Sequence, residues 1–379
     1  MASMRLKLIR LGLDAFHVLR AHRVLTSFAR GRGLVLMLHR VRPASGDPFQ
    51  PNAHLEVTPE FLAAALGRVR SAGIPIVGMD EAARRLADPA DGSRFVVVTF
   101  DDGYRDNYEH AWPILKAAGA PFTIFVATGL VNGTANFWWA TLEEVVRRAD
   151  RIRVDRDGTP LDLPARTPGE KHAAMKTLGR WIEPLPESRK DATIRALAET
   201  HGVDIPALLA ANIMDWNEIA AMAADPLVTI GGHTVSHPAL ARLPATAALR
   251  EMVDGAAEIG RRLGRRPVHF AYPYGYARAA GQREFELAAR AGFRTAVTTR
   301  PGMLPRAQEA AGAMTALPRL SLNGNFQSVR YLDVFLSGAP FAIHAGLKRI
   351  ARTPALASTI GFRRRPVHPF DEVAGRNDP

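Results

Sequence analysis

Short apolar runs separated by helical patterns are the feature that most limits what this chain can fold into. Residues 34–38 and 96–100 are apolar or β-branched throughout, without the alternation of a half-exposed strand. Strands buried on both faces and alternating with helices are typical of a parallel sheet, so we expect an α/β fold. The other predicted strands cover residues 74–77, 121–127, 227–230, 268–271, 295–298 and 317–322.

Composition narrows the classes of site that the chain can carry. Its 379 residues suffice for one large domain or two smaller ones, and they include no cysteine. That absence excludes disulfides, thiolate metal sites and cysteine nucleophiles. The net charge of +12 is concentrated at the ends, with +8 on residues 1–42 and +4 on residues 341–379, so the region between them balances to zero. We therefore expect no nucleic acid partner for the central region.

The N-terminal segment, residues 1–32, predicts a basic amphipathic helix. No stretch approaches the roughly 20 apolar residues of a membrane span, and charged residues from Asp14 to Arg23 interrupt any secretion signal. We therefore expect a cytoplasmic protein. Two interpretations of the helix stay open: it packs on the domain that follows, which we favour, or it attaches to an anionic membrane surface on the inner face. Residues 341–379 are expected to form a basic tail.

The strand–helix alternation breaks between residues 137 and 215. This segment predicts helices only, near 140–150, 169–183 and 187–200, with a possible hairpin turn at the polar residues 155–158. We interpret residues 137–215 as a helical insert or lid on a main domain of residues 33–340.

Two adjacent carboxylates, Asp101 and Asp102, directly follow the buried run 96–100. Like charges at the mouth of a buried strand repel, so one must be neutralised or a cation must bind. The alternative is a helix cap before a helix that starts near Arg105, but one aspartate suffices for a cap. A functional site is therefore the better interpretation.

A histidine pair, His233 and His237, follows the predicted strand 227–230 and two glycines, and Pro238 ends the segment. The spacing alone is weak, because surface histidine pairs are common. Beside an acidic pair, however, two imidazoles and one carboxylate form a usual ligand set for a catalytic divalent metal. The carboxyl ends of parallel strands meet on one face, which would bring these groups together.

Such a site suits hydrolysis of an amide or ester. One carboxylate binds the metal, and the other acts as general base on water whose pKa the metal lowers to about 7. The general acid would be His39, which follows the run 34–38. The alternative for His39 is a structural histidine that is hydrogen-bonded under a loop.

At this point the motifs resemble a known family. The segments Thr99–Gly103 and His233–Pro238 are similar to the first two motifs of the polysaccharide deacetylases, which include nodulation-type chitooligosaccharide deacetylases. The resemblance covers about residues 34–322. It implies a distorted (β/α) barrel of about seven parallel strands with a helical insert, and a divalent metal, usually Zn²⁺.

The resemblance also implies roles for single residues. Asp102, His233 and His237 would be the metal ligands, and Asp101 the catalytic base. Residues 270–275 resemble the third motif, whose backbone near Tyr272 would help hold the oxyanion, with Tyr274 beside it. Residues 137–139 hold Trp138, which we expect at the rim because aromatic faces stack on sugar rings. The alternative for these aromatic residues is that they anchor the insert to the barrel.

Three departures from the family pattern matter. Ala271 or Tyr272 stands where the third motif usually has the arginine that orients the base, and Arg319 is our candidate substitute from another strand end. The late Leu-x-His motif is not evident, since Ile343-His344 matches it poorly. Residues 37–41 resemble the early histidine motif of poly-N-acetylglucosamine deacetylases, which supports His39 as the acid.

The sequence therefore predicts a metal-dependent hydrolase that removes N-acetyl groups from an N-acetylhexosamine-containing polysaccharide, oligosaccharide or glycolipid. Two alternatives remain. One is a catalytically inactive carbohydrate-binding or assembly protein on the same fold, which the missing arginine favours. The other is an amidase of small non-sugar molecules, against which the aromatic residues argue.

Overall fold

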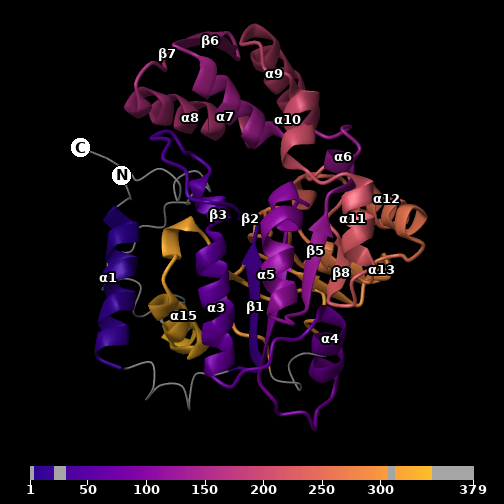
Figure 1. Cartoon of the computed structure of the whole chain (residues 1–379). Helices are drawn as coiled ribbons and strands as arrows, with labels where there is room; N and C mark the ends of the chain where they lie inside the picture. The colour runs from indigo at the N-terminus through magenta and orange to yellow at the C-terminus, as the bar shows by residue number, and fades with distance from the viewer. Residues whose placement is uncertain (1–3, 21–30, 306–311, 344–379) are drawn as a thin grey trace, which may run out of the picture.

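The computed structural model describes residues 4–20, 31–305 and 312–343, and its core is a seven-stranded sheet. The neighbouring strands that pair over register-matched residues all run parallel, in the order β10-β9-β8-β5-β4-β1-β11. The sheet curls into a half-barrel, which confirms the predicted α/β barrel architecture (Figure 1). The strands are β1 (Gly33–Leu38), β4 (Phe95–Phe100), β5 (Phe122–Val126), β8 (Val228–Gly232), β9 (His269–Ala271), β10 (Thr295–Val297) and β11 (Leu320–Ser321).

The central strands form because their residues have no polar face to expose. Every residue of β1, β4 and β5 is buried, including Thr99 and Thr123. Both faces of these strands are therefore covered: one face packs against helices, and the other faces the barrel interior, where Val35, Val97 and Phe125 share a cluster with residues of β9 and β10. The strand expected at residues 74–77 is reduced to a bridge between Ile76 and Val96.

One segment brings the two edges of the sheet together. Leu317 bridges Val297 of β10, and the Arg319 amide donates to the Arg300 carbonyl. Immediately afterwards Leu320 pairs with Leu36 of β1. Residues 317–321 thus run from the edge strand β10 to β1 and form the other edge strand, β11, which places Arg319 across the barrel from β8.

Helices cover the outside of the sheet. Helix α3 begins at a Thr58 cap, whose side chain accepts from the Phe61 amide, and its apolar face lies on the core. Helix α12 likewise packs its apolar face against β8, where it buries Met252, Ala256 and Ile259. The helices of this layer are α3 (Pro59–Ser71), α4 (Met79–Ala87), α5 (Trp112–Ala117), α6 (Thr128–Val131), α11 (Trp216–Ala223), α12 (Ala245–Leu263), α13 (Gln282–Arg290) and α15 (Val329–Leu336).

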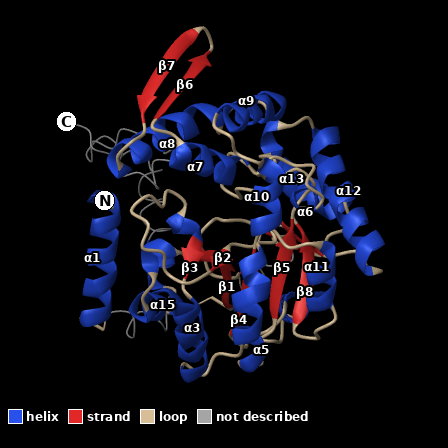
Figure 2. Cartoon of the chain, turned by 45° about the horizontal axis from the view of Figure 1, so that its top comes forward, coloured by secondary structure: helices blue, strands red, loops and turns tan. Residues whose placement is uncertain are grey.

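The segment between β5 and β8 lies across the carboxyl ends of the strands (Figures 1 and 2). The expectation of helices only was wrong, because residues 151–164 form a hairpin of β6 and β7. The candidate turn at residues 155–158 is confirmed: Asp157 and Gly158 both have positive φ, the geometry that a two-residue hairpin loop needs. The elements are α7 (Trp138–Arg148), β6 (Arg151–Arg156), β7 (Thr159–Pro164), α8 (Pro168–Ile182), α9 (Glu187–Thr200) and α10 (Ile205–Asn212).

The N-terminal helix α1 (Met4–Val18) packs along α15. Leu13 is buried against Tyr331 and Val334, and Arg10 donates to the Asn325 carbonyl. The favoured interpretation of this helix, packing on the domain, is therefore confirmed for one of its faces. None of the helices within the described residues is long and apolar enough to cross a membrane.

Candidate functional site

The acidic pair lies where β4 leaves the sheet. Asp101 and Asp102 are 2% and 3% exposed, although each carries a formal charge. Asp102 has a φ of 73°, and Gly103 follows at 81°. Asparagine and aspartate tolerate this left-handed region better than most residues, and here it turns the two carboxylates in different directions. Each carboxylate therefore meets its own set of partners.

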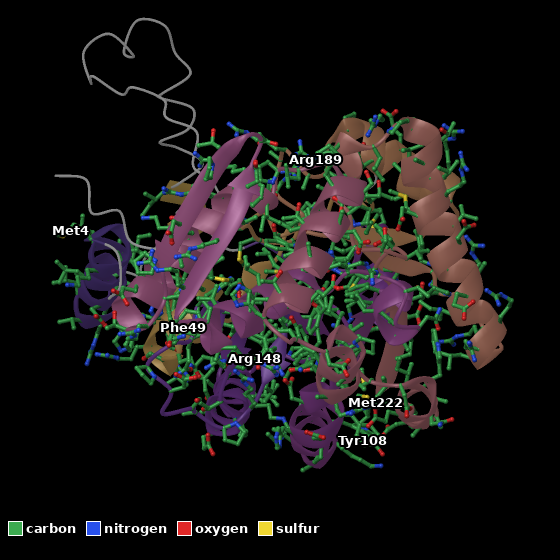
Figure 3. All side chains as sticks on the ribbon, turned by 90° about the horizontal axis from the view of Figure 1, so that it is seen from above. Met4, Phe49, Tyr108, Arg148, Arg189 and Met222 are labelled. Carbon is green, nitrogen blue, oxygen red and sulfur yellow. The ribbon has the colours of Figure 1, made fainter. Side chains whose placement is uncertain are left out.

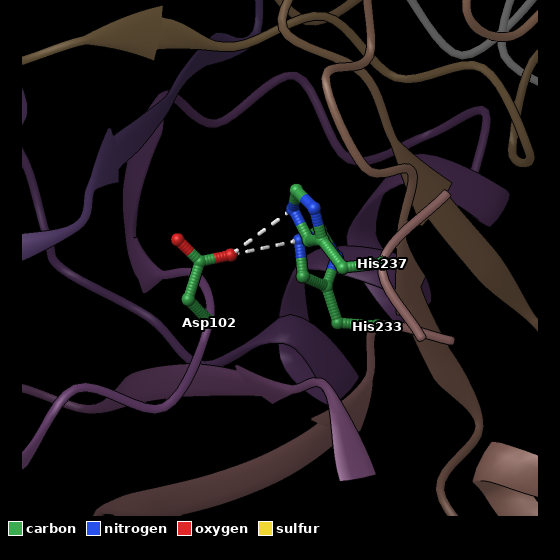
Figure 4. Close-up of side chains that lie close together, drawn as sticks. All are labelled: Asp102, His233 and His237. Carbon is green, nitrogen blue, oxygen red and sulfur yellow. Dashed lines mark ion pairs between the residues drawn. The ribbon is translucent and has the colours of Figure 1, made fainter. Parts of the chain in front are cut away.

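Asp102 faces the two histidines that the sequence paired. Its Oδ1 lies 3.3 Å from the Nε2 of His233 and 3.3 Å from the Nε2 of His237. Figure 4 shows both rings directed at the same carboxylate oxygen. One ligand atom from each of the three residues lies within 4.8 Å of the others, and all three residues are buried. The structure thus brings together the trio that the motifs suggested.

The hydrogen bonding of this trio fits a cation better than a proton. His233 Nδ1 lies 2.7 Å from the Ala271 carbonyl, so Nδ1 carries a hydrogen, and the neutral form of the ring presents the lone pair of Nε2 to Asp102. Asp102 Oδ1 is buried and receives no hydrogen bond of acceptable geometry. Two imidazole nitrogens and one carboxylate oxygen that converge without bonding each other match the donor set of a divalent metal with an open coordination position.

The loop that carries the histidines is held from behind. Glu251 on α12 accepts from the Val235 and Ser236 amides and from the Ser236 hydroxyl, at 2.9, 2.9 and 2.7 Å. Thr234 and His237 have φ values of 69° and 59°, which are unfavourable, above all for a β-branched threonine. Backbone strain of this kind persists only where surrounding contacts hold it in place, and it is concentrated at functional sites. The strained backbone of this loop therefore supports a functional role for it.

Asp101 is paired with an arginine from the other end of the chain. Arg319 is fully buried, and its Nη1 and Nη2 donate to the two carboxylate oxygens of Asp101 at 2.7 and 2.6 Å. Its Nε donates to the Thr298 carbonyl, which fixes the plane of the guanidinium. Burial opposes ionisation of Asp101, but the Arg319 charge outweighs it, so the pKa of Asp101 lies below its ordinary value. Arg319, the candidate from the sequence, is therefore the partner of Asp101.

His39 is half-buried at the carboxyl end of β1, on the same side as the acidic pair. Burial lowers the pKa of His39 below 6.5, although Asp102 and Asp101 partly offset this. The imidazole is therefore neutral at pH 7, and it must take up a proton before it can give one away as an acid. Leu38 pairs with Phe100, so His39 and Asp101 follow neighbouring strands at the same end of the sheet.

A second histidine, His54, went unnoticed in the sequence. Burial, followed by the charge of His39, lowers the pKa of His54 to about 4, and its Nδ1 is buried without a hydrogen-bond partner. It comes from the loop between two short parallel strands, β2 (Arg40–Val41) and β3 (Glu56–Val57), whose pairing folds this loop back over the barrel. No spacing or motif in the sequence indicates His54, because the pairing of β2 with β3 that positions it follows from no local sequence pattern.

Aromatic rings enclose the His237 side of the trio. The rings of Trp139 and Tyr274 each lie 5.0 Å from the His237 ring. Trp138 donates its indole N–H to the Tyr274 hydroxyl at 3.0 Å, and only 4% of it is exposed. Trp138 therefore packs between the insert and the barrel, which is the anchoring alternative. Trp139, the second tryptophan of the predicted aromatic segment 137–139, is the one beside the candidate ligand.

The expectation for Tyr272 needs a correction. Its backbone N–H donates to the Val297 carbonyl in the sheet, and its hydroxyl donates to the Thr315 carbonyl at 2.8 Å. Neither donor is directed at the site, because the amide continues the ladder of β9 with β10 and the hydroxyl is bonded to a backbone carbonyl. Ile343 lies at the end of the described residues and His344 outside them, as do most of the basic tail and residues 21–30.

Comparisons with known proteins agree with the motifs. Residues 88–154 and 177–296 match the family model described as polysaccharide deacetylase. The gap in this match lies inside the insert. YxkH of Bacillus subtilis (strain 168), a protein named for the same family, is 49% identical over 39 residues, which span 10% of this chain and 14% of YxkH.

Two solved structures share the fold. The Streptococcus pyogenes deacetylase PplD in complex with acetate superposes with a TM-score of 0.53 at 20% identity, over 79% of this chain and 96% of PplD. IcaB from Ammonifex degensii superposes with a TM-score of 0.51 at 21% identity, over 82% of this chain and 98% of IcaB. At these identities, the two likenesses support the architecture alone.

The trio geometry generates a metal-binding prediction. Purified protein incubated with Zn²⁺ and then desalted should retain about one ion per chain, and His237→Ala should lower retention at least tenfold, because it removes one of three protein ligands. Elemental analysis measures this directly. His172→Ala, on the exposed surface of α8, is the matched control and should retain the wild-type content. Equal metal content in His237→Ala and wild type would contradict the assignment.

The ion pair generates a second prediction. Because the pKa of Asp101 is depressed, the pair stabilises the fold above the unfolded carboxyl pKa of about 3.9, and this stabilisation is lost as the pH falls through the folded pKa. Arg319→Met leaves a buried charge unpaired, so the free energy of unfolding at pH 7 should fall by about 3–5 kcal/mol. The difference from wild type should shrink in acid, as denaturant titrations at several pH values would measure. A difference independent of pH would show that the pair is not the cause.

Proposed function

We propose, on the premise that this chain carries a polysaccharide deacetylase domain, that it is a metal-dependent carbohydrate N-deacetylase. Its substrate would be a polysaccharide, oligosaccharide or glycolipid that contains N-acetylhexosamine, and its products would be acetate and the free amino sugar. The family match confirms the resemblance that the motifs suggested. The chemistry proposed here is supported by the site itself.

One observation carries the proposal. Asp102, His233 and His237 converge in a buried position, while the adjacent Asp101 is turned away and held by Arg319. Two neighbouring carboxylates thus have separate environments and separate roles. Structural needs do not explain this arrangement, because a fold gains nothing from burying two acids side by side.

A divalent cation held by Asp102, His233 and His237 would polarise the amide carbonyl and lower the pKa of a water molecule to about 7. Zn²⁺ is the ion that this donor set favours. Asp101 would receive the proton of that water on a carboxylate oxygen. Its lowered pKa makes it a weak base but keeps it ionised, and Arg319 holds both of its oxygens in one plane. The lowered pKa of the water molecule would offset the weak basicity of Asp101.

His39 would complete the reaction by protonating the leaving amine. The C–N bond of the acetamido group breaks only if the nitrogen leaves as an amine, so a proton donor is needed on that side. His39 directly follows β1, which pairs with β4, the strand that precedes Asp101. Because burial keeps its imidazole neutral at pH 7, the proton that it donates must come from the reaction itself or from solvent.

The two alternative functions differ in what they require. An inactive sugar-binding protein was favoured by the arginine missing from the third motif, but Arg319 supplies a bidentate partner for Asp101 from another strand. An amidase of small molecules needs no aromatic enclosure, whereas Trp139 and Tyr274 flank His237 here. Acetate release from chitin oligomers, compared with release from N-acetylated amino acids, separates the three.

The assigned base gives the sharpest activity prediction. Asp101→Asn keeps the size and the hydrogen-bonding oxygen of the side chain but cannot accept a proton, so acetate release should fall about a thousandfold. The metal content should stay at the wild-type level, since Asp101 is not among the three ligands. Asp101→Asn turning over at the wild-type rate would remove Asp101 from the mechanism. Glu109→Gln, an exposed carboxylate on the helix that follows, is the matched control.

Replacing His39, the proposed acid, should change the kinetics in a different way from replacing the proposed base. His39→Ala should lower kcat about a hundredfold and change KM little, because the group acts on the leaving amine in the transition state. A substrate with a more acidic leaving amine, such as an N-acetylated aniline glycoside, should be affected less. Equal losses with both substrates would assign His39 a role in binding or folding.

The cytoplasmic location expected from the sequence stays a prediction. Fractionation of cells that express the chain, followed by detection in the soluble and membrane fractions, would test it.

A further inference from the structure

Exposed apolar side chains gather at one place on the described surface. Six of the seven large hydrophobic residues that are exposed lie between Met4 and Leu19, on α1 or directly after it. Met4, Leu8, Leu11 and Val18 are 69%, 61%, 66% and 73% exposed. Single exposed leucines are normal on a protein surface, but a concentration of this kind marks an interaction site.

These residues form one continuous stripe. Met4, Leu8, Leu11, Ala15 and Val18 follow the spacing of three and four residues that keeps side chains on one face of a helix. We call this face the outer stripe. Figure 3 shows Met4 at the outer edge of the molecule. The opposite face carries Leu13, which is 7% exposed against α15. Docking on the barrel therefore leaves the stripe uncovered.

The helix is basic as well as apolar. The described residues 4–20 hold Arg5, Lys7, Arg10, Arg20 and Asp14, a net charge of +3, while the region between residue 42 and residue 341 balances to zero. On α1 itself Lys7 is exposed beside the stripe, and Arg10 and Asp14 face the domain, where they contact Asn325 and Tyr331. A short apolar face with a basic residue on its border is typical of a helix that lies in the interface of a bilayer.

Charge decides between the possible occupants of the stripe. A second copy of the chain would bring a helix of the same sign against it. The chain's own residues 344–379 carry +4 and would do the same. A bilayer surface with anionic lipids has the opposite charge and accepts apolar side chains. Apolar insertion and electrostatic attraction together supply the two contributions that stable peripheral attachment needs.

We propose that the outer stripe of α1 inserts into the surface of an anionic bilayer, with the helix axis parallel to the membrane. The inner face of α1 stays docked on α15, so the barrel is held with this flank against the lipid. The attachment is independent of the proposed chemistry. It would place the catalytic domain on the surface where lipid-linked sugars are found.

Vesicle flotation with the full chain tests this inference. The wild type should float with vesicles of phosphatidylcholine containing about one-third phosphatidylglycerol, stay behind with pure phosphatidylcholine, and be released at about 1 M NaCl, where the Debye length is only about 3 Å. The double variant Leu8→Gln/Leu11→Gln removes apolar surface without changing charge, and it should weaken binding at least tenfold. Its melting temperature and its acetate release from a soluble substrate should equal those of the wild type.

Two controls locate the attachment. Ile343→Gln changes the exposed hydrophobic residue outside α1 and should bind as wild type. Arg363→Gln/Arg364→Gln/Arg365→Gln reduces the charge of the C-terminal tail and should retain most of the binding. Because the chain has no cysteine, Leu11→Cys labelled with an environment-sensitive dye reports insertion directly. Its emission should shift to the blue with anionic vesicles, while that of labelled Arg189→Cys on α9 should not.

Three results would overturn the proposal. The first is flotation of the stripe variant as wild type, or loss of binding in the tail variant alone. The second is a wild-type dimer in light scattering that the stripe variant converts to a monomer, without vesicle binding by either, since a second copy would then cover the stripe. The third is no binding of the wild type to anionic vesicles and no spectral shift at residue 11.

Discussion

Two neighbouring carboxylates at the end of a buried strand are the constraint on which this structure depends. Asp101 and Asp102 lie in a part of the protein that excludes water, where unpaired charges are costly. Each must therefore be compensated by a group brought from elsewhere in the chain. Arg319 compensates the first, and the convergence of His233 and His237 on the second leaves room for a cation.

Segments at two sides of the barrel bring these compensating groups to the acidic pair. The segment 317–321 joins β10 to β1 and thereby delivers Arg319 to the interior, beneath the acidic pair. On the other side, Glu251 of α12 holds the loop that aims the histidines. Among the described residues outside glycine, six have positive φ, and four of these are Asp102, Thr234, His237 and Tyr274. Backbone strain is thus concentrated at the site, where the surrounding packing sustains it.

The sequence predicted best those features that depend on residues close together in the chain. Uniformly apolar strands identified the sheet, and the residues that follow them identified Asp101, Asp102, His233 and His237. Arg319 was named because the third motif lacks its usual arginine and this residue stands near another predicted strand. What was missed depends on pairing between distant segments. The engagement of the Tyr272 amide by Val297, the return of His54 over the barrel and the burial of Trp138 under the insert all follow from tertiary contacts that leave no periodic signal.

In the proposed mechanism, one rim of the barrel holds a single cation through two imidazoles and one carboxylate. X-ray absorption spectroscopy of protein loaded with one equivalent of Zn²⁺ tests it most directly. The account predicts a coordination shell with two imidazole nitrogens at about 2.0–2.1 Å, completed by oxygen ligands. A spectrum without imidazole scattering, or one explained by oxygen ligands alone, would contradict it.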